Sequence, residues 1–338
     1  QNGLKVILKE EHAIPMIGMS LFYNVGSHDE PSGVKGMTKL QTYLAEESGS
    51  TSKEGWSPDD FKEGVVTLRG WTANEFKGLI KGLTRSSDIY SDRDVFSITH
   101  EFNKTYLQDI LQLEANRMEF LDITDSSLVR AKAIFKSKLA HRYKDNISAA
   151  FNDLNRFEED HPYVKNEWGD WLEVDSISLN TAIEYRQKYF NPNNATLVLV
   201  GDFKSAEIVG IVNSLFGGIE NKSSVPIDPE FAINNKEHVL LDDVFDDDIP
   251  VFYGQLAMCN INIPSFRDAD MIIMEHVIRL LNYDNAFGGI YSRKYLNKIG
   301  TFSFTNINPS IGPSEVSFVA LNPFLRKKDK HLKKIIKK

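Results

Sequence analysis

Several features that would mark a particular kind of protein are missing from this 338-residue chain. Cys259 is the only cysteine, which excludes an intrachain disulfide. No apolar run approaches the ~18 residues that a membrane-crossing helix needs. Acidic residues outnumber basic ones, 47 to 39, and the net charge of −8 argues against a nucleic-acid-binding body, which usually has a basic face. The sequence also contains no phosphate loop, nucleophile elbow or cysteine-based zinc pattern.

The composition is otherwise that of an ordinary globular protein, with 41% apolar and 25% charged residues. Alternating and β-branched runs predict strands at 4–9, 17–25, 194–201, 238–242, 251–262, 301–307 and 315–321. Helical periodicity predicts helices at 36–44, 95–121, 127–156, 205–216 and 268–281. This mixture of strands and helices predicts an α+β fold.

A change of composition divides the chain. Residues 221–236 are rich in Pro, Asn, Ser and Lys and show no periodicity, which is typical of a linker. We therefore predict a first domain over 1–220 and a second over 237–338. Strand and helix groups recur on both sides of the linker, which indicates two related α+β halves.

The most informative segment is 25–44. Its fixed points are a Val-Gly-Ser tripeptide, one glutamate and two glycines, namely Val25-Gly26-Ser27, Glu30, Gly33 and Gly36. In the helix that follows, Lys39, Thr42 and Tyr43 occupy positions i, i+3 and i+4, so Lys39 and Tyr43 share one helical face. Other distinctive stretches lie at 2–8, 22–30, 113–118, 161–163, 168–169 and 189–203.

In their order and spacing these stretches resemble the pitrilysin/insulinase family of zinc metallopeptidases. The resemblance covers most of 1–220 and, less clearly, 235–325. It implies tandem, related α/β-sandwich domains, with the second incomplete here because the chain stops at Lys338. It also implies a location in the bacterial periplasm or cell envelope, with the mitochondrion as the alternative.

The resemblance places the family's metal-binding helix, G-x-A-H-x-x-E-H, at 36–43. Two histidines at i and i+4 hold zinc there, and the glutamate between them takes a proton from metal-bound water. The matching residues here are Lys39, Thr42 and Tyr43. A lysine ammonium has no lone pair, threonine is no base near pH 7, and a neutral tyrosine is a poor zinc ligand.

The family's third ligand, a glutamate, aligns with Ser137 or its neighbour Lys138. All three ligands and the base are therefore replaced, and we expect no zinc, no other cofactor and no catalytic residue. Tyr43 is expected to fill the space of a ligand histidine. Glu46 and Glu47 are candidate ion-pair partners for Lys39.

In the second half, 292–295 resembles the family's S-R-x-Y segment, which helps to bind the substrate backbone. Arg293 and Tyr295 are therefore candidate peptide-binding residues. The expected role is that of a non-catalytic partner or scaffold subunit that can hold peptide for a zinc-bearing homologous subunit in a heterodimer. Two alternatives stay open: an active zinc endopeptidase with displaced ligands, and a purely structural subunit of a membrane-associated assembly.

Three other patterns have ordinary structural interpretations. The cluster His28-Asp29-Glu30 is interpreted as part of the strand and loop framework rather than as a metal site. The acidic run at 242–248 lacks calcium-loop spacing and is interpreted as a solvated turn. The basic tail at 325–338 is interpreted as the start of an ordinary helix, the alternative being an amphipathic helix on an anionic membrane surface.

Overall fold

The computed structural model describes residues 2–51, 70–144, 168–169 and 171–224, together with the backbone of four strands between 238 and 322. The chain divides into two compact units. The first comprises 1–149 and 156–227, and the second comprises 150–155 and 228–338. None of the helices in the described ranges combines the length and the apolarity required to cross a bilayer.

The first unit is built on a five-stranded mixed sheet in the order β1-β7-β2-β5-β4. β1 runs parallel to β7, and the other neighbours are antiparallel. The strands are β1 (Lys5–Glu10), β2 (Met16–Tyr23), β4 (Thr84–Ser91), β5 (Phe96–Asn103) and β7 (Ala195–Gly201). A separate two-stranded sheet pairs β3 (Gly49–Ser50) with β6 (Leu121–Asp122).

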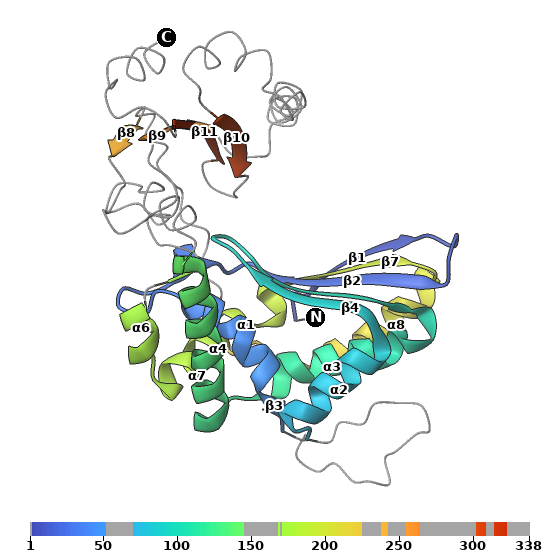
Figure 1. Cartoon of the computed structure of the whole chain (residues 1–338). Helices are drawn as coiled ribbons and strands as arrows, with labels where there is room; N and C mark the ends of the chain where they lie inside the picture. Colours follow the sequence, from blue (N-terminus) through green and yellow to red (C-terminus); the bar gives the residue numbers. More distant parts are fainter. Residues whose placement is uncertain are drawn as a thin grey trace. The chain divides into compact units, whose positions relative to one another are not determined.

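Helices cover one face of the five-stranded sheet (Figure 1). They are α1 (Met37–Glu47), α2 (Ala73–Leu83), α3 (Leu107–Phe120), α4 (Asp125–Lys144), α6 (Trp171–Ser176), α7 (Leu179–Tyr189) and α8 (Ser205–Phe216). Strand β2 shows why the sheet has a covered side: Ile17, Met19, Leu21 and Tyr23 alternate along it and are almost completely buried. Burying each of these side chains contributes roughly 1.5–3 kcal/mol, so this alternation fixes which face meets the helices.

One helix prediction is wrong. The helix expected over 95–121 is in fact strand β5, a short 3-10 turn at 104–106 and then α3. Along β5, Phe96, Ile98, His100 and Phe102 are buried, which is the period of a strand. The prediction wrongly continued the apolar stripe of α3 toward the N-terminus over these residues. The strand β4 and the helices α2 and α7 were not predicted.

In the second unit, four antiparallel strands form a sheet in the order β10-β11-β9-β8. They are β8 (His238–Asp242), β9 (Gln255–Ile263), β10 (Phe302–Asn308) and β11 (Ser314–Asn322). The strands predicted in this half are therefore confirmed. The helix predicted at 268–281 and the basic tail at 325–338 lie outside the described residues.

Candidate functional site

The start of α1 is fixed by a buried carboxylate. Glu30 is 1% exposed, and its two oxygens accept hydrogen bonds from the backbone N–H groups of Gly36 and Thr38, both at 2.8 Å. The first N–H groups of a helix have no partner within the helix, and the helix dipole favours negative charge at that end. Glu30 therefore caps α1, which agrees with the framework interpretation of the 28–30 cluster.

Gly36 sets the direction in which the chain approaches α1. Its φ is +92°, a conformation that favours glycine. An added Cβ would lie 3.0 Å from Val174 and 3.1 Å from Phe135. Both the backbone conformation and the tight surroundings therefore require glycine at this position.

Lys39, the first of the residues predicted to replace metal ligands, lies in the interior. Its side chain is 8% exposed, and its ammonium donates a hydrogen bond to the carbonyl of Ser91, the last residue of β4, at 3.1 Å. The ammonium also lies 4.6 Å from the ring centroid of Trp168 and 5.5 Å from that of Tyr90. A buried cation needs such partners. Lys39 thereby ties α1 to the end of β4.

Thr42 and Tyr43 are also satisfied within the protein. Thr42 is 4% exposed, and its hydroxyl donates to the carbonyl of Lys39 at 2.7 Å. Tyr43 is half-buried and packs on Phe135 of α4, with 5.5 Å between ring centroids. Burial, aided by the negative charge of Glu46, raises the pKa of Tyr43, so its phenol is neutral at pH 7.

Ser137 does not join these three residues. It is exposed, whereas Phe135 is fully buried and is the α4 residue in contact with Tyr43. Side chains two positions apart on a helix point in very different directions, since each residue turns the helix by about 100°. The structure therefore places an aromatic ring of α4, not Ser137, opposite Tyr43 on α1.

These residues do not fit a zinc ion. An ammonium, a threonine hydroxyl bound within its own helix, a neutral phenol and a phenylalanine ring offer no set of zinc ligands. Moreover, no group of three or more His, Cys, Asp or Glu side chains is placed to hold a metal anywhere in the described part of the chain.

The carboxylates at the other end of α1 do not pair with Lys39. Glu47 forms ion pairs with Lys77 of α2 and Arg130 of α4. Burial acts to raise the pKa of Glu47, but the hydrogen bonds and charges of these two cations outweigh it and lower the pKa. Lys39 is eight residues away, about 12 Å along the helix. The predicted pairing is therefore replaced by a clamp among α1, α2 and α4.

Strand β4 forms an edge of the sheet. One side of it pairs with β5, and no described strand lies along the other side. Residues 85–88 are exposed. An exposed strand edge offers N–H and C=O groups to an extended peptide. This strand was missed in the sequence because Ile89 is the only aliphatic residue among its eight, too few for an alternating signal.

His28 has a nearly buried side chain, with its ring nitrogens 3.3 Å from a carboxylate oxygen of Asp29 and 3.6 Å from one of Asp94. The candidate peptide-binding residues Arg293 and Tyr295 lie outside the described residues.

The first unit is thus an α+β layer structure in which the capped helix α1 is joined by Lys39 to the end of the edge strand β4. Comparison with known proteins shows relatives of this chain. The family described as Peptidase M16 inactive domain matches residues 176–258. The zinc protease PqqE of Helicobacter pylori is 23% identical over 288 residues, which are 83% of this chain and 59% of that protein. The chain thus spans less than two thirds of that relative.

Solved structures share the fold. A protease from Helicobacter pylori superposes with a TM-score of 0.78 at 19% identity, covering 99% of this chain and 76% of that one. The first half of the periplasmic protease PqqL from Escherichia coli gives 0.68 at 13% identity, covering 96% and 67%. The chain is therefore a homologue of the pitrilysin-type M16 zinc peptidases, and the predicted family resemblance and α+β fold are confirmed.

Proposed function

We propose that this chain is a non-catalytic M16 homologue that holds an extended peptide along the free edge of β4, beside a zinc-bearing homologous subunit. The observation that carries the proposal is the position of Lys39. In the proposed alignment Lys39 takes the position of the family's first ligand histidine. Its ammonium donates to the carbonyl of Ser91 of β4 and lies beside two aromatic rings. A fixed positive charge at this point repels a metal cation.

The same residues lack the groups that peptide hydrolysis needs. A hydrolytic site requires an activated water and a base within hydrogen-bond reach of it. In the same alignment Thr42 takes the position of the base, and its hydroxyl donates to the helix carbonyl of Lys39. Tyr43 packs on Phe135. The interior around the former site is thus filled and satisfied by side chains that do no acid–base chemistry near pH 7.

The sheet edge supports the binding half of the proposal. A peptide that adds to β4 as a further strand gains main-chain hydrogen bonds whatever its sequence. The hydrogen bond from Lys39 holds the end of β4 in place, so the edge is ordered before a peptide arrives. In this proposal Arg293 and Tyr295 of the second half contribute further contacts to the peptide backbone.

Metal content and peptide cleavage test the non-catalytic half. The purified chain is dialysed, its zinc is measured by elemental mass spectrometry, and cleavage of a fluorogenic peptide library is followed with and without chelator. We expect zinc far below one per chain and no cleavage. Zinc near one per chain together with chelator-sensitive cleavage would establish the alternative of an active endopeptidase with displaced ligands.

Peptide binding is tested by fluorescence anisotropy with three peptides of identical side chains. One is unmodified, and the other two are N-methylated at alternate residues in opposite registers, so that each lacks N–H donors along one edge. We expect the unmodified peptide to bind and one of the two N-methylated peptides not to bind. Equal binding of all peptides would exclude strand addition.

The proposed setting is the bacterial periplasm or cell envelope, in complex with a zinc-bearing homologue. PqqL, which shares the fold, is described as periplasmic. Affinity purification from the source cell tests this by identifying co-purifying proteins. Recovery of a homologue with intact ligand residues supports the pairing. Recovery of membrane-assembly subunits alone, with no peptide affinity in the anisotropy assay, would assign the chain a purely structural role.

A further inference from the structure

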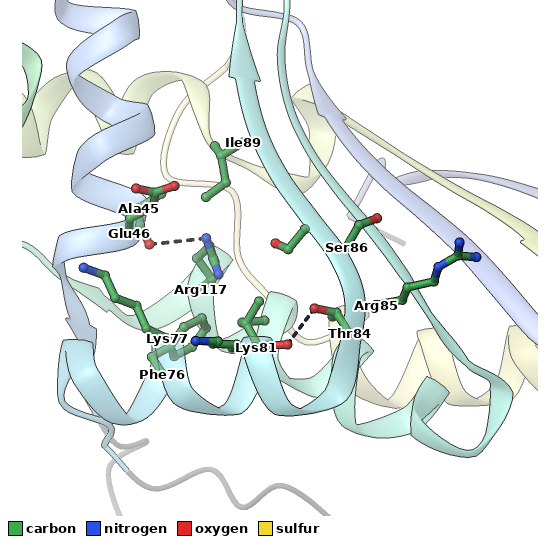
Figure 2. Close-up of a pocket in the computed structure, with 12 residues that line it drawn as sticks. Ala45, Glu46, Phe76, Lys77, Lys81, Thr84, Arg85, Ser86, Ile89 and Arg117 are labelled. Atoms are coloured by element: carbon green, nitrogen blue, oxygen red, sulfur yellow. Dashed lines mark hydrogen bonds between the residues drawn. The ribbon is translucent and has the colours of Figure 1, made fainter. Parts of the chain in front are cut away.

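A cavity of about 510 Å³ lies between the C-terminal end of α1, α2 and β4 (Figure 2). Its apolar lining comes from all of these elements, namely Ala45, Phe76, Ile80 and Ile89. Because β4 contributes to the lining, the cavity adjoins the edge at which a peptide would be held. Side chains of a strand alternate between its two faces, so alternate side chains of an added peptide strand would point toward the helix layer and this cavity.

Cations gather in the cavity. Lys77 and Lys81 are four residues apart on α2 and therefore share one face of that helix. Arg117 reaches the cavity from α3. Figure 2 shows these three side chains around one space, whereas Arg85, at the rim, extends away from them.

Arg117 is held rigidly. Its side chain is about 4% exposed, it donates to the carbonyl of Ala45 at 3.2 Å, and its guanidinium lies 4.7 Å from the ring centroid of Phe76. Its Nε lies 3.3 Å from the buried carboxylate of Glu114. A cation with a fixed position loses little conformational entropy when it binds an anion.

Lys81 is the cation available to a ligand. Lys77 is already engaged by Glu47, but Lys81 is exposed and forms no ion pair with any other described residue. Glu46 is the only carboxylate among the lining residues. Burial raises the pKa of Glu46, which shows that its negative charge is poorly solvated there. Since Lys77 pairs with Glu47 and Arg117 lies beside Glu114, Lys81 is the cation of these three whose charge no described carboxylate neutralises.

We propose that this cavity binds a carboxylate of a peptide lying along β4, with Lys81 and Arg117 as its partners and with the apolar lining against the neighbouring carbon atoms. This inference rests on the proposed function and narrows its ligand to peptides that place a carboxylate in this cavity. The carboxylate can come from a glutamate side chain or from the C-terminus of the peptide.

Three fluorescein-labelled peptides of equal length test the proposal by anisotropy. The first has glutamates at alternate positions and an amidated C-terminus, the second has glutamines instead, and the third is the glutamine peptide with a free C-terminus. We expect one of the two carboxylate peptides to bind about tenfold more tightly than the neutral one, as loss of a charged hydrogen bond implies. Tighter binding of the first peptide would identify a glutamate side chain as the bound carboxylate, and tighter binding of the third would identify the C-terminus.

The decisive variant is Lys81→Glu, which we expect to abolish the preference. Lys81 is exposed, so its replacement leaves the fold intact, and circular dichroism checks this. The matched control is Lys5→Glu, an exposed lysine on β1 at the opposite edge of the sheet, which should keep the full preference.

Three results would overturn the inference. One is an unchanged preference in Lys81→Glu, and another is an equal loss in Lys5→Glu, which would indicate only overall charge. The third is equal binding of all three peptides, which leaves peptide holding intact while removing the acidic specificity. If none of the three peptides binds, the proposed function fails together with this inference.

Discussion

The charged side chains at the two ends of α1 differ in their burial and in their partners. At the N-terminal end, Glu30 and Lys39 are buried, and their charged groups are bound to the protein's own backbone. At the C-terminal end, Glu47 is paired with Lys77 and Arg130, but Glu46 is exposed and lines an open cavity together with the exposed Lys81 of α2. Charges that the protein satisfies internally serve its stability, and charges left to solvent are available to a ligand. The proposed loss of metal chemistry and the proposed binding of a carboxylate therefore concern different ends of the same helix.

The largest expected effect is at the N-terminal end. Gly36→Ala should lower the free energy of unfolding by about 2–4 kcal/mol, since alanine is strained at a positive φ and its Cβ would press on Val174 and Phe135. Gly33→Ala is the control, because φ is +85° there but no atom lies within 4 Å of the added Cβ. Urea denaturation should show a loss of only about 1 kcal/mol for the control. Equal losses would mean that the tight packing around Gly36 contributes nothing.

The next effect compares Lys39 of α1 with Lys81 of α2, which lines the cavity near the other end of α1. Lys39→Met should lower the free energy of unfolding by about 1–2 kcal/mol, because the buried carbonyl of Ser91 loses its donor and the cation leaves the aromatic rings. Lys81→Met should change it by less than about 0.5 kcal/mol. Thermal and urea unfolding of both variants measure the difference. If Lys81→Met were as destabilising as Lys39→Met, the distinction between internal and available charge would be lost.

The smallest expected effect is a pH dependence due to Glu47. Because Lys77 and Arg130 lower its pKa in the folded protein, its contribution to stability is present above the unfolded pKa of about 4.3 and is lost as pH falls through the folded value. Glu47→Gln should therefore be less stable than the parent at pH 7, and the two should converge toward pH 3. Urea midpoints across this range test the sign. A gap that widens on acidification would contradict it.

Much of the fold was predictable because its strands bury strongly apolar residues. β2 and β7 alternate clearly, and the glycine and glutamate framework before α1 was visible in the sequence. The polar strand β4 was not predictable, because hydrogen bonding to β5 stabilises it and few of its side chains are buried. Tertiary pairing overrides local propensity in such a strand.

The candidate site was predictable in part. Spacing alone put Lys39 and Tyr43 on one helical face, but the partners of Lys39 are Ser91 and two aromatic residues distant in sequence. Which α4 side chain faces Tyr43 also depends on the rotation of α4 about its axis. An alignment error of one residue changes the expected direction of a side chain by about 100°. The cavity cations come from α2 and α3 and meet only in the folded unit.

The order of strands in the sheet has a consequence for biosynthesis. β1 has one neighbour in the sheet, β7, so Lys5 pairs with Thr196. Closing so long a loop is slow, because non-local contacts must overcome the entropy of the intervening chain. During synthesis on the ribosome, β1 therefore cannot pair with β7 until almost the whole first unit has been made. We expect a nascent chain arrested before β7 to be sensitive to protease and one arrested after α8 to be resistant.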